Sequence, residues 1–408
     1  MPDVSVLEVK LHGRTIGTLT HVGADRTLFA FTDAYIADRQ RPTLSLAFKD
    51  EFGQLVTDFL PHQRQVEPFF SNLLPEGQMR TWLAARAGVK PEREFFLLWV
   101  LGPDLPGAVE IAPADGQAWP SDAADGDNAD TSEEGGRHAL RFSLAGVQIK
   151  FSAVQDGRRG LTIPAKGVGG SWIVKLPPRE FHNVPEAEYA MLTLAAKLGI
   201  NVPAIRLVDT AGIGNLPEDL RRTAGQSLAI ERFDRTGDGG KVHIEDFAQV
   251  FDQYPQRKYE RASYAGIARV LAIETPDDVP EFVRRVAFNV LIGNGDMHMK
   301  NWSLAYPDRR HPRLAPAYDF VPTVAFMQDR TTALNVARLK RFDRIDLDDF
   351  ARLAARAMLP EKPVLDAVRE TVALFHQHWA AEKNHLPLAA KAVAAIDAHL
   401  RTIPLARQ

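Results

Sequence analysis

The chain has 408 residues, of which 45% are hydrophobic and 25% are charged, and its formal net charge is −3. This length allows two or three domains with separate cores, and the near-neutral charge gives no overall reason to expect direct nucleic-acid binding. The absence of cysteine excludes disulfides, thiolate metal sites and cysteine nucleophiles. The sequence shows no signal-peptide pattern and no apolar run of bilayer length, so we expect a cytoplasmic protein that does not contact membranes.

The first part of the chain, residues 1–112, combines strand and helix patterns and is predicted to form an α+β module. Apolar residues recur at helical spacing from Pro68 to Gly88, and residues 92–101 form a second helix candidate. Three segments alternate apolar and polar side chains, which is typical of half-buried strands. These segments are residues 4–9, 15–19 and 44–48.

Residues 113–137 differ in composition from the rest of the chain. They are rich in Ala, Asp, Gly, Ser and Glu, and Trp119 is their only aromatic residue. Such a segment cannot bury enough apolar surface to offset the entropy of ordering it. We therefore predict an acidic, mobile linker or surface loop.

A strand–strand–helix–strand order follows in residues 138–235. The helix begins near Pro185 and ends at Gly199. This order predicts a mixed sheet with a helix packed on it. The strand candidates are residues 142–144 and 147–151, joined across Gly146, and residues 171–176 and 227–233.

Residues 236–408 are predicted to be mostly helical. Apolar residues between Phe282 and Leu291 recur at i, i+1, i+4 and i+5, which predicts one broad buried face. Further helical patterns cover residues 347–358 and 363–380 and the C-terminal region.

Directly behind the apolar segment that ends at Leu291, a polar loop carries Asp296 and Asn301 in a D-x-x-x-x-N pattern. In phosphoryl-transfer enzymes, an Asp at this spacing orients the attacking hydroxyl and an Asn holds magnesium. Asp319, followed by Phe320, resembles the metal-binding Asp of a D-F-G motif. Asp and Asn are also common in turns, so each of these residues taken alone fits an ordinary loop equally well.

Lys175 lies inside an apolar strand candidate, where it either reaches solvent from an edge or faces a cleft and meets an anion. The helix that follows carries Glu186 and Glu188. A strand Lys paired with a helix Glu is a protein-kinase arrangement. We predict Glu188 as the partner, with Glu186 in reserve, although both acids also fit a solvated helix face.

Taken together, five motifs in this order resemble the HipA toxin kinases, the serine/threonine kinase halves of bacterial HipBA-type toxin–antitoxin modules. The resemblance covers nearly the whole chain, including F-F-S-N-L-L-P-E-G at residues 69–77, and implies a two-lobed, kinase-like α+β fold. In that fold residues 138–235 form the N-lobe and residues 236–408 the helical C-lobe. The five motifs are F-S-L-A-G-V-Q-I-K, W-I-V-K-L-P, E-R-F-D-R, N-G-D-M-H-M-K-N-W-S and P-A-Y-D-F.

The resemblance also implies roles for individual residues. Asp296 would be the catalytic base, Asn301 and Asp319 the Mg²⁺ ligands, and Ser143 an autophosphorylated serine whose modification ejects the nucleotide loop and silences the kinase. A phosphoserine adds roughly −1.5 to −2 charges beside the bound phosphates, so ejection makes electrostatic sense. The residues implied to contact ATP are Ala145, Gly146, Val147, Gln148, Ile149, Lys150, Lys175, Glu231, Phe233, His298, Lys300, Asn301, Tyr318 and Asp319.

Family membership would further imply growth inhibition by phosphorylation of an aminoacyl-tRNA synthetase such as glutamyl-tRNA synthetase. The implied partner is a HipB-type helix-turn-helix antitoxin, through which the complex would contact operator DNA. Two alternatives stay open. Asn294-Gly295-Asp296 approaches the H-G-D-x-x-x-x-N loop of aminoglycoside and choline kinases, which favours a small-molecule kinase. The other alternative is a catalytically silent co-repressor that only binds the antitoxin.

Overall fold

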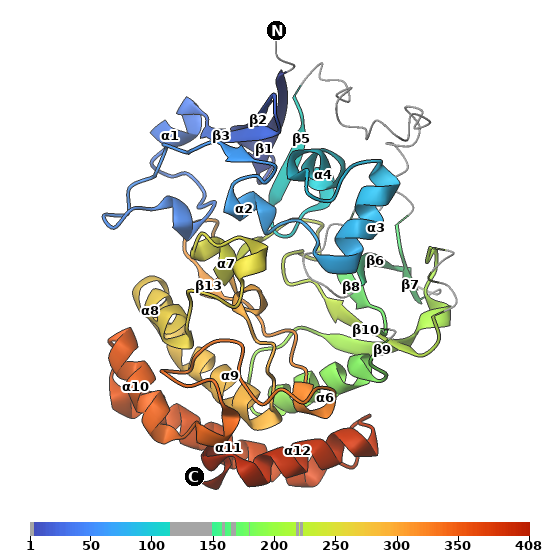
Figure 1. Ribbon diagram of the computed structural model, residues 1–408, viewed down its shortest axis with the longest axis vertical. Helices are drawn as coiled ribbons and strands as arrows, with labels where there is room; N and C mark the ends of the chain where they lie inside the picture. The colour runs from blue at the N-terminus through green and yellow to red at the C-terminus, as the bar shows by residue number, and fades with distance from the viewer. Residues whose placement is uncertain are drawn as a thin grey trace.

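The molecule combines an N-terminal module, a second sheet beside it and a helical lobe below both (Figure 1). In the described part of the chain, no helix is long and apolar enough to cross a membrane. The computed structural model describes residues 4–114, 149–156, 160–164, 169–178, 180–217, 220 and 223–408.

The N-terminal module, residues 4–113, is a five-stranded antiparallel sheet with helices on it, in the strand order β4-β3-β2-β1-β5. The expected strands at residues 4–9 and 15–19 are present. The helical segment expected from Pro68 to Gly88 is divided into two helices, Pro68–Ser71 and Gly77–Ala87, and the second ends at Gly88 as expected, with Gly88 in the left-handed conformation at φ 67°. The elements are β1 (Val4–Leu11), β2 (Arg14–Val22), β3 (Arg26–Phe31), α1 (Asp33–Ala37), β4 (His62–Gln63), α2 (Pro68–Ser71), α3 (Gly77–Ala87), α4 (Glu94–Leu101) and β5 (Val109–Pro113).

The predicted strand at residues 44–48 is wrong, because this segment forms a short 3₁₀ helix, Leu46–Phe48. The Ser45 hydroxyl accepts a hydrogen bond from the Ala47 amide and caps the turn. The buried carboxylate of Glu245 accepts hydrogen bonds from the Ser45 hydroxyl and the Leu46 amide. These long-range contacts, which alternation does not reveal, select the turn.

The second sheet has the strand order β7-β6-β8-β10-β9, and every ladder in it is antiparallel. The predicted mixed sheet is therefore wrong, whereas the predicted helix packed on the sheet is present as α6. After α6 the chain enters β9, which runs in the same direction as β8. The two strands are not neighbours, because β10 lies between them and pairs antiparallel with both. The elements are β6 (Lys150–Asp156), β7 (Gly160–Thr162), β8 (Trp172–Lys175), α6 (Val184–Lys197), β9 (Ile205–Asp209) and β10 (Gln226–Glu231).

One hydrophobic cluster joins the N-terminal module to the second sheet. Phe151 and Val174, from one face of that sheet, belong to the same buried cluster as Phe70 and Leu98 of the module. The opposite face, with Leu228 and others, packs in the cluster of α6 and the helical lobe. The second sheet is thus held from both sides. The division into domains at residue 112 stays a prediction.

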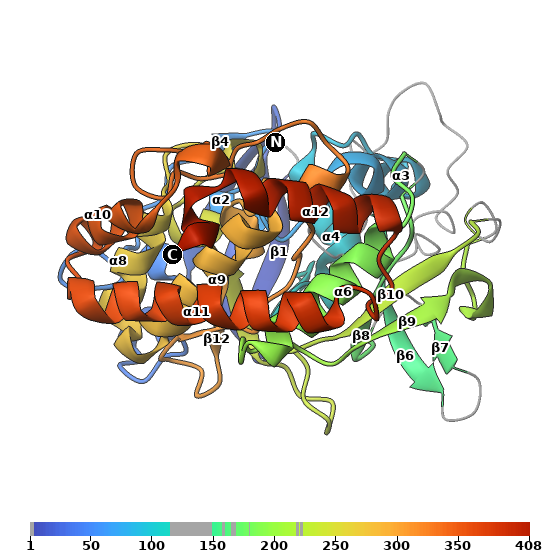
Figure 2. The ribbon, with the colours of Figure 1, turned by 90° about the horizontal axis from the view of Figure 1, so that it is seen from below.

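The helical lobe is built around α9 (Val279–Ile292), the buried helix predicted from the sequence. Figure 2 shows α11 and α12 lying across it from below. A small sheet, β11-β12-β13, interrupts the predicted run of helices. The other elements are β11 (His243–Asp246), α7 (Phe247–Val250), α8 (Tyr264–Glu274), β12 (Ser303–Tyr306), β13 (Arg313–Leu314), α10 (Leu347–Ala357), α11 (Glu361–Glu382) and α12 (Ala390–Thr402).

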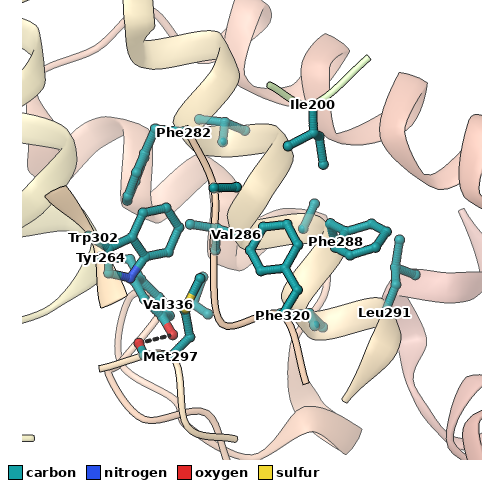
Figure 3. Packing of buried hydrophobic residues seen from close by; sticks show 14 of the residues in the cluster. Ile200, Tyr264, Phe282, Val286, Phe288, Leu291, Met297, Trp302, Phe320 and Val336 are labelled. Carbon is teal, nitrogen blue, oxygen red and sulfur yellow. Dashed lines mark hydrogen bonds between the residues drawn. The ribbon is translucent and has the colours of Figure 1, made fainter. Parts of the chain in front are cut away.

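The polar loop behind α9 is anchored by its apolar residues (Figure 3). Trp302 packs on Phe282 with ring centroids 4.7 Å apart, and Tyr264 donates a hydrogen bond to the Met297 carbonyl at 3.0 Å. Met297 and Trp302 are both buried. Since Met297 and Trp302 pack in the core, the loop between them is fixed to the lobe at both places.

A buried carboxylate, Glu245, joins the N-terminal module to the helical lobe. It accepts hydrogen bonds from the Ser45 hydroxyl at 2.5 Å, from the Leu46 amide at 3.0 Å and from the Tyr306 hydroxyl. Burial raises the pKa of Glu245 to about 7, although these three donors oppose the shift.

Replacing Glu245 with Gln should increase stability at alkaline pH. Because the folded-state pKa of about 7 lies above the ordinary value of 4.5, this group's full contribution is present below pH 4.5 and is lost as pH rises through 7. Glu245→Gln removes the charge; its oxygen can accept from Leu46 and Tyr306 and its amide nitrogen can donate to the Ser45 hydroxyl. It should therefore gain up to about 3 kcal/mol at pH 8 and little at pH 4.5. Urea unfolding across this pH range measures the effect. Glu51→Gln, at an exposed position, is the control, and an equal gain there would contradict the explanation.

Candidate functional site

A cleft of about 750 Å³ lies where the N-terminal module, the second sheet and the helical lobe meet. All predicted site residues that the structure describes line it, although they come from segments far apart in the chain. Ser143 and the predicted nucleotide-loop residues Ala145, Gly146, Val147 and Gln148 lie outside the described residues. The predicted residues in the cleft wall are Ile149, Lys150, Lys175, Glu188, Glu231, Phe233, Asp296, His298, Lys300, Asn301, Tyr318 and Asp319.

The loop that carries Asp296 begins where α9 ends at Gly293. Gly293 has a φ of 70°, and a Cβ there would meet the Val324 side chain at 2.5 Å, so both its conformation and its space require glycine. The next residue, Asn294, donates to the Asn289 side chain at 2.8 Å and accepts from the Asp296 amide at 3.0 Å. The sharp turn and this buried amide therefore fix the direction in which Asp296 leaves the helix.

Asp296 and Asn301 are held together as the D-x-x-x-x-N spacing predicts. The Asn301 side-chain amide donates to the Asp296 carbonyl at 2.9 Å. The Asp296 carboxylate faces the cleft, and its Oδ1 accepts a hydrogen bond from the Tyr259 hydroxyl at 2.5 Å. Partial burial in the cleft raises the pKa of Asp296, and the Tyr259 hydrogen bond and the Lys258 cation oppose this shift.

Lys175, Glu188 and Asp319 form a buried charge cluster on the other wall. Lys175 Nζ lies 2.6 Å from Glu188 Oε1 and also contacts the Asp319 carboxylate. The ion pair with Glu188, rather than Glu186, is thus present in the structure. Although burial alone would lower it, the two carboxylates raise the pKa of Lys175, so this side chain is a fixed cation.

Asp319 occupies a strained backbone position at the edge of this cluster. Its φ is 57°, a conformation that costs a residue with a Cβ about 1 kcal/mol or more. Its amide donates to Glu188 Oε1 at 3.1 Å, and its carbonyl accepts from the Asn294 side chain at 3.1 Å. Burial alone would raise the pKa of Asp319, but Lys175 and Lys150 hold it well below its usual range. The residue is therefore an ionised carboxylate, which is 28% exposed to the cleft.

Lys150 is a second cation near this cluster, at the start of β6. Burial lowers the pKa of its ammonium to about 8, with Asp319 opposing the shift and Lys175 adding to it. The two lysines and the two carboxylates thus share one wall of the cleft. This is the arrangement that an anionic ligand with several negative oxygens would meet.

The E-R-F-D-R turn after β10 combines an aromatic wall with a structural network. The Phe233 ring stacks on Tyr318 with centroids 5.9 Å apart, and both rings line the cleft. Arg232 and Arg235 are paired with Asp234 at 2.8 Å each, and Arg235 also reaches Asp104 of the N-terminal module at 2.9 Å. The salt bridges of Arg232 and Arg235 therefore fix the shape of this turn and tie it to the N-terminal module.

His298 and Lys300 project from the polar loop in different ways. His298 is buried, its Nδ1 has no hydrogen-bond partner among the described residues, and burial lowers its pKa to about 3, so the ring is neutral. Lys300 Nζ donates to the carbonyl and the side-chain oxygen of Asn72, both at 2.9 Å, and lies 3.3 Å from Asp246. Its ammonium is thus tied to the N-terminal module. The contact of both residues with ATP phosphates stays a prediction.

Four residues that hold or approach the polar loop were not predicted from the sequence as site residues. They lie close to the polar loop but come from two other places, the segment after α2 and the turn before α8. The sequence signal for the first pair was the F-F-S-N-L-L-P-E-G motif, whereas the second pair lies in a charged stretch typical of a solvated turn. Asn72, Glu76 and Lys258 line the cleft, and Tyr259 contacts Asp296 from beside it.

Asn301 and Asp319 offer the oxygen ligands that magnesium prefers, and both line the cleft. Asn301 uses its amide nitrogen in the hydrogen bond to Asp296, which leaves its side-chain oxygen for a ligand, and Asp319 supplies an ionised carboxylate. No group of three or more His, Asp or Glu arranged to hold a metal is found in the part of the chain that the structure describes. Magnesium commonly takes one or two protein oxygens and fills its remaining positions with phosphates and water.

Comparison with known proteins gives the family. The model of the HipA-like C-terminal domain matches residues 142–379, and that of the HipA N-terminal domain matches residues 7–112. "Putative kinase Y4dM" of Sinorhizobium fredii is 54% identical over 412 residues, which cover 100% of this chain and 99% of that protein. "Serine/threonine-protein kinase toxin HipA" of Shewanella oneidensis is 26% identical over 381 residues, or 83% of this chain and 79% of that protein.

A solved structure shows the same fold. The HipA chain in the complex of HipA, HipB and operator DNA from Shewanella oneidensis superposes with a TM-score of 0.72 at 22% identity. The match covers 98% of this chain and 96% of that chain. The α+β architecture, with its β-rich N-terminal region and helical C-terminal part, is therefore that of a HipA-like kinase, as the sequence predicted. The two family models and the 54% identity to a full-length relative show that the chain belongs to the HipA family of kinases.

Proposed function

We propose that this kinase transfers the γ-phosphoryl group of ATP to a serine or threonine hydroxyl of a protein. The observation that carries the proposal is the convergence of the Lys175–Glu188–Asp319 cluster and the Asp296–Asn301 pair on one cleft. A strand lysine, a helix glutamate, a metal-type aspartate and a loop aspartate are the parts of a phosphoryl-transfer site.

Each group has a defined task in the proposed reaction. Lys175 and Lys150 bind phosphate oxygens, and Phe233 and Tyr318 offer an aromatic surface to the adenine end. Asn301 and Asp319 hold Mg²⁺, which when bound neutralises charge on the phosphates. Asp296 orients the acceptor hydroxyl and receives its proton, while the bond from the acceptor oxygen to the γ-phosphorus forms, the bond to the β,γ-bridging oxygen breaks and ADP leaves.

The biological role that we propose is that of a toxin in a toxin–antitoxin module. Two facts support it: a relative named a serine/threonine-protein kinase toxin aligns over most of the chain, and the matching structure is a HipA in complex with HipB and operator DNA. The partner is then a HipB-type antitoxin, through which operator DNA is bound, and the substrate is a protein such as an aminoacyl-tRNA synthetase. Inactivating autophosphorylation would fall on Ser143.

Incubation with [γ-³²P]ATP and MgCl₂, followed by phosphosite mapping, tests the proposal. We expect label on the chain itself, on Ser143, and on a serine or threonine of a second protein when a lysate of the host is added. Aminoglycosides and choline are included as acceptors. Phosphorylation of one of these small molecules with no label on any protein would contradict the proposal and favour a small-molecule kinase.

A further inference from the structure

The N-terminal module reaches the polar loop through two charged contacts. Lys258, 7% exposed, places its Nζ 2.9 Å from Glu76 Oε2. Glu76 also lies 3.6 Å from Lys300, the residue before Asn301. Burial alone would raise the pKa of Glu76, but Lys300 and Lys258 hold it below its ordinary value. A carboxylate of the module is therefore ionised between two lysines that belong to the active-site side of the cleft.

Lys258 is in turn fixed to the segment that carries Asp296. Its carbonyl accepts a hydrogen bond from the Met299 amide at 3.2 Å, and its ammonium lies 5.7 Å from the centre of the Tyr259 ring. Tyr259 packs edge-on against His298 at 5.1 Å and donates from its hydroxyl to Asp296 Oδ1. A continuous series of contacts thus leads from the N-terminal module to the carboxylate at the centre of the site.

We propose that Glu76 and Tyr259 are positioning residues for phosphoryl transfer: Glu76 holds Lys258, and Tyr259 holds the Asp296 carboxylate so that Oδ2 faces the acceptor hydroxyl. No hydrogen bond reaches Oδ2 from the residues that the structure describes, so this oxygen is available to a substrate. The inference rests on the proposed role of Asp296. On this proposal the N-terminal module is part of the catalytic arrangement, because its Glu76 side chain helps to position the base, Asp296.

The test compares the wild type with Tyr259→Phe and Glu76→Gln. Two measurements are made: the single-turnover rate of autophosphorylation at saturating ATP, and the dissociation constant of a fluorescent ATP analogue. Loss of the hydrogen bond should lower the rate of Tyr259→Phe roughly tenfold, because small displacements of a catalytic group are costly. Nucleotide affinity should stay within about twofold. The double variant should be no slower than Tyr259→Phe, because residues that act through one another are not additive.

The same interface supplies matched controls. Tyr254 donates to His62 Nδ1 at 2.8 Å, and His62 Nε2 lies 2.8 Å from Glu67, so this second Tyr–Glu group joins the same two parts of the molecule. It makes no contact with Asp296. Tyr254→Phe and Glu67→Gln should therefore keep the wild-type rate. An equal loss in these controls would show that the effect comes from general weakening of the interface and would overturn the proposal.

Further outcomes distinguish the inference from the proposed function. If the wild type transfers phosphate and Asp296→Asn does not, while Tyr259→Phe and Glu76→Gln keep the full rate, only the inference fails. A faster Tyr259→Phe variant would also overturn it, because the tyrosine would then compete with the acceptor. Amide hydrogen exchange gives a readout without activity: peptides covering residues 293–301 should exchange faster in Tyr259→Phe, and those covering α9 should not. Absence of label on the wild type would instead refute the proposed function.

Discussion

Replacing Asp296 with Asn is expected to lower the rate of phosphoryl transfer about 10³-fold, within the range that a positioned general base contributes. The replacement has the same shape and can still accept the Tyr259 hydrogen bond, so the loop should keep its conformation. The amide cannot take the acceptor's proton. Binding of ATP should change little, because Lys175 and Lys150, which we propose as the phosphate-binding residues, lie on the other wall of the cleft.

The measurement is the single-turnover rate of label transfer from [γ-³²P]ATP, together with a titration of a fluorescent ATP analogue. Asp308→Asn, at an exposed turn beside His311, serves as the control for loss of a carboxylate. A variant at position 296 that transfers phosphate at the wild-type rate would remove this residue from the mechanism. A variant that no longer binds nucleotide would show that its effect is structural.

The parts of the site that could be predicted from sequence are those set by local chemistry. Gly293 ends a strongly periodic helix, and the five-residue interval from Asp296 to Asn301 closes on itself through one hydrogen bond. For Lys175 in an apolar strand the sequence left two outcomes, an edge that reaches solvent or a cleft that holds an anion, and the structure shows the second, with Glu188 and Asp319. A charged residue such as Lys175 is unfavourable in an apolar strand unless it has a partner, so its position in the sequence indicated that a partner could be found elsewhere in the chain.

The parts that could not be predicted depend on which surfaces meet. Nothing in the charged turn around Tyr259 distinguishes it from a solvated loop, and its contact with Asp296 exists only because the turn before α8 folds over the polar loop. The resemblance places Lys300 at the phosphates, which stays a prediction, but it gave no sign that the Lys300 ammonium also donates to Asn72 of the N-terminal module. The prediction of a mixed second sheet was wrong for the same reason, because the strand order depends on the insertion of β10 between β8 and β9.

Replacing Lys175 with Met is expected to abolish transfer and also to weaken the fold. The side chain is 5% exposed and is shared by two carboxylates, those of Glu188 and Asp319. Removing one partner of a buried charge cluster leaves the others uncompensated and costs about 3 kcal/mol or more. A loss of activity in the single variant would therefore not separate catalysis from folding.

The double variant Lys175→Met/Glu188→Gln separates the two effects. The Gln side chain keeps an oxygen for the Asp319 amide but removes one of the two unpaired charges, so urea unfolding should recover roughly half of the lost stability. Phosphoryl transfer should stay at least about 10²-fold below the wild type, because no cation is left at that position to meet the phosphates. If transfer returned together with stability, Lys175 would act only by keeping the two carboxylates in place. A folded but inactive double variant would instead assign the phosphate contact to this lysine.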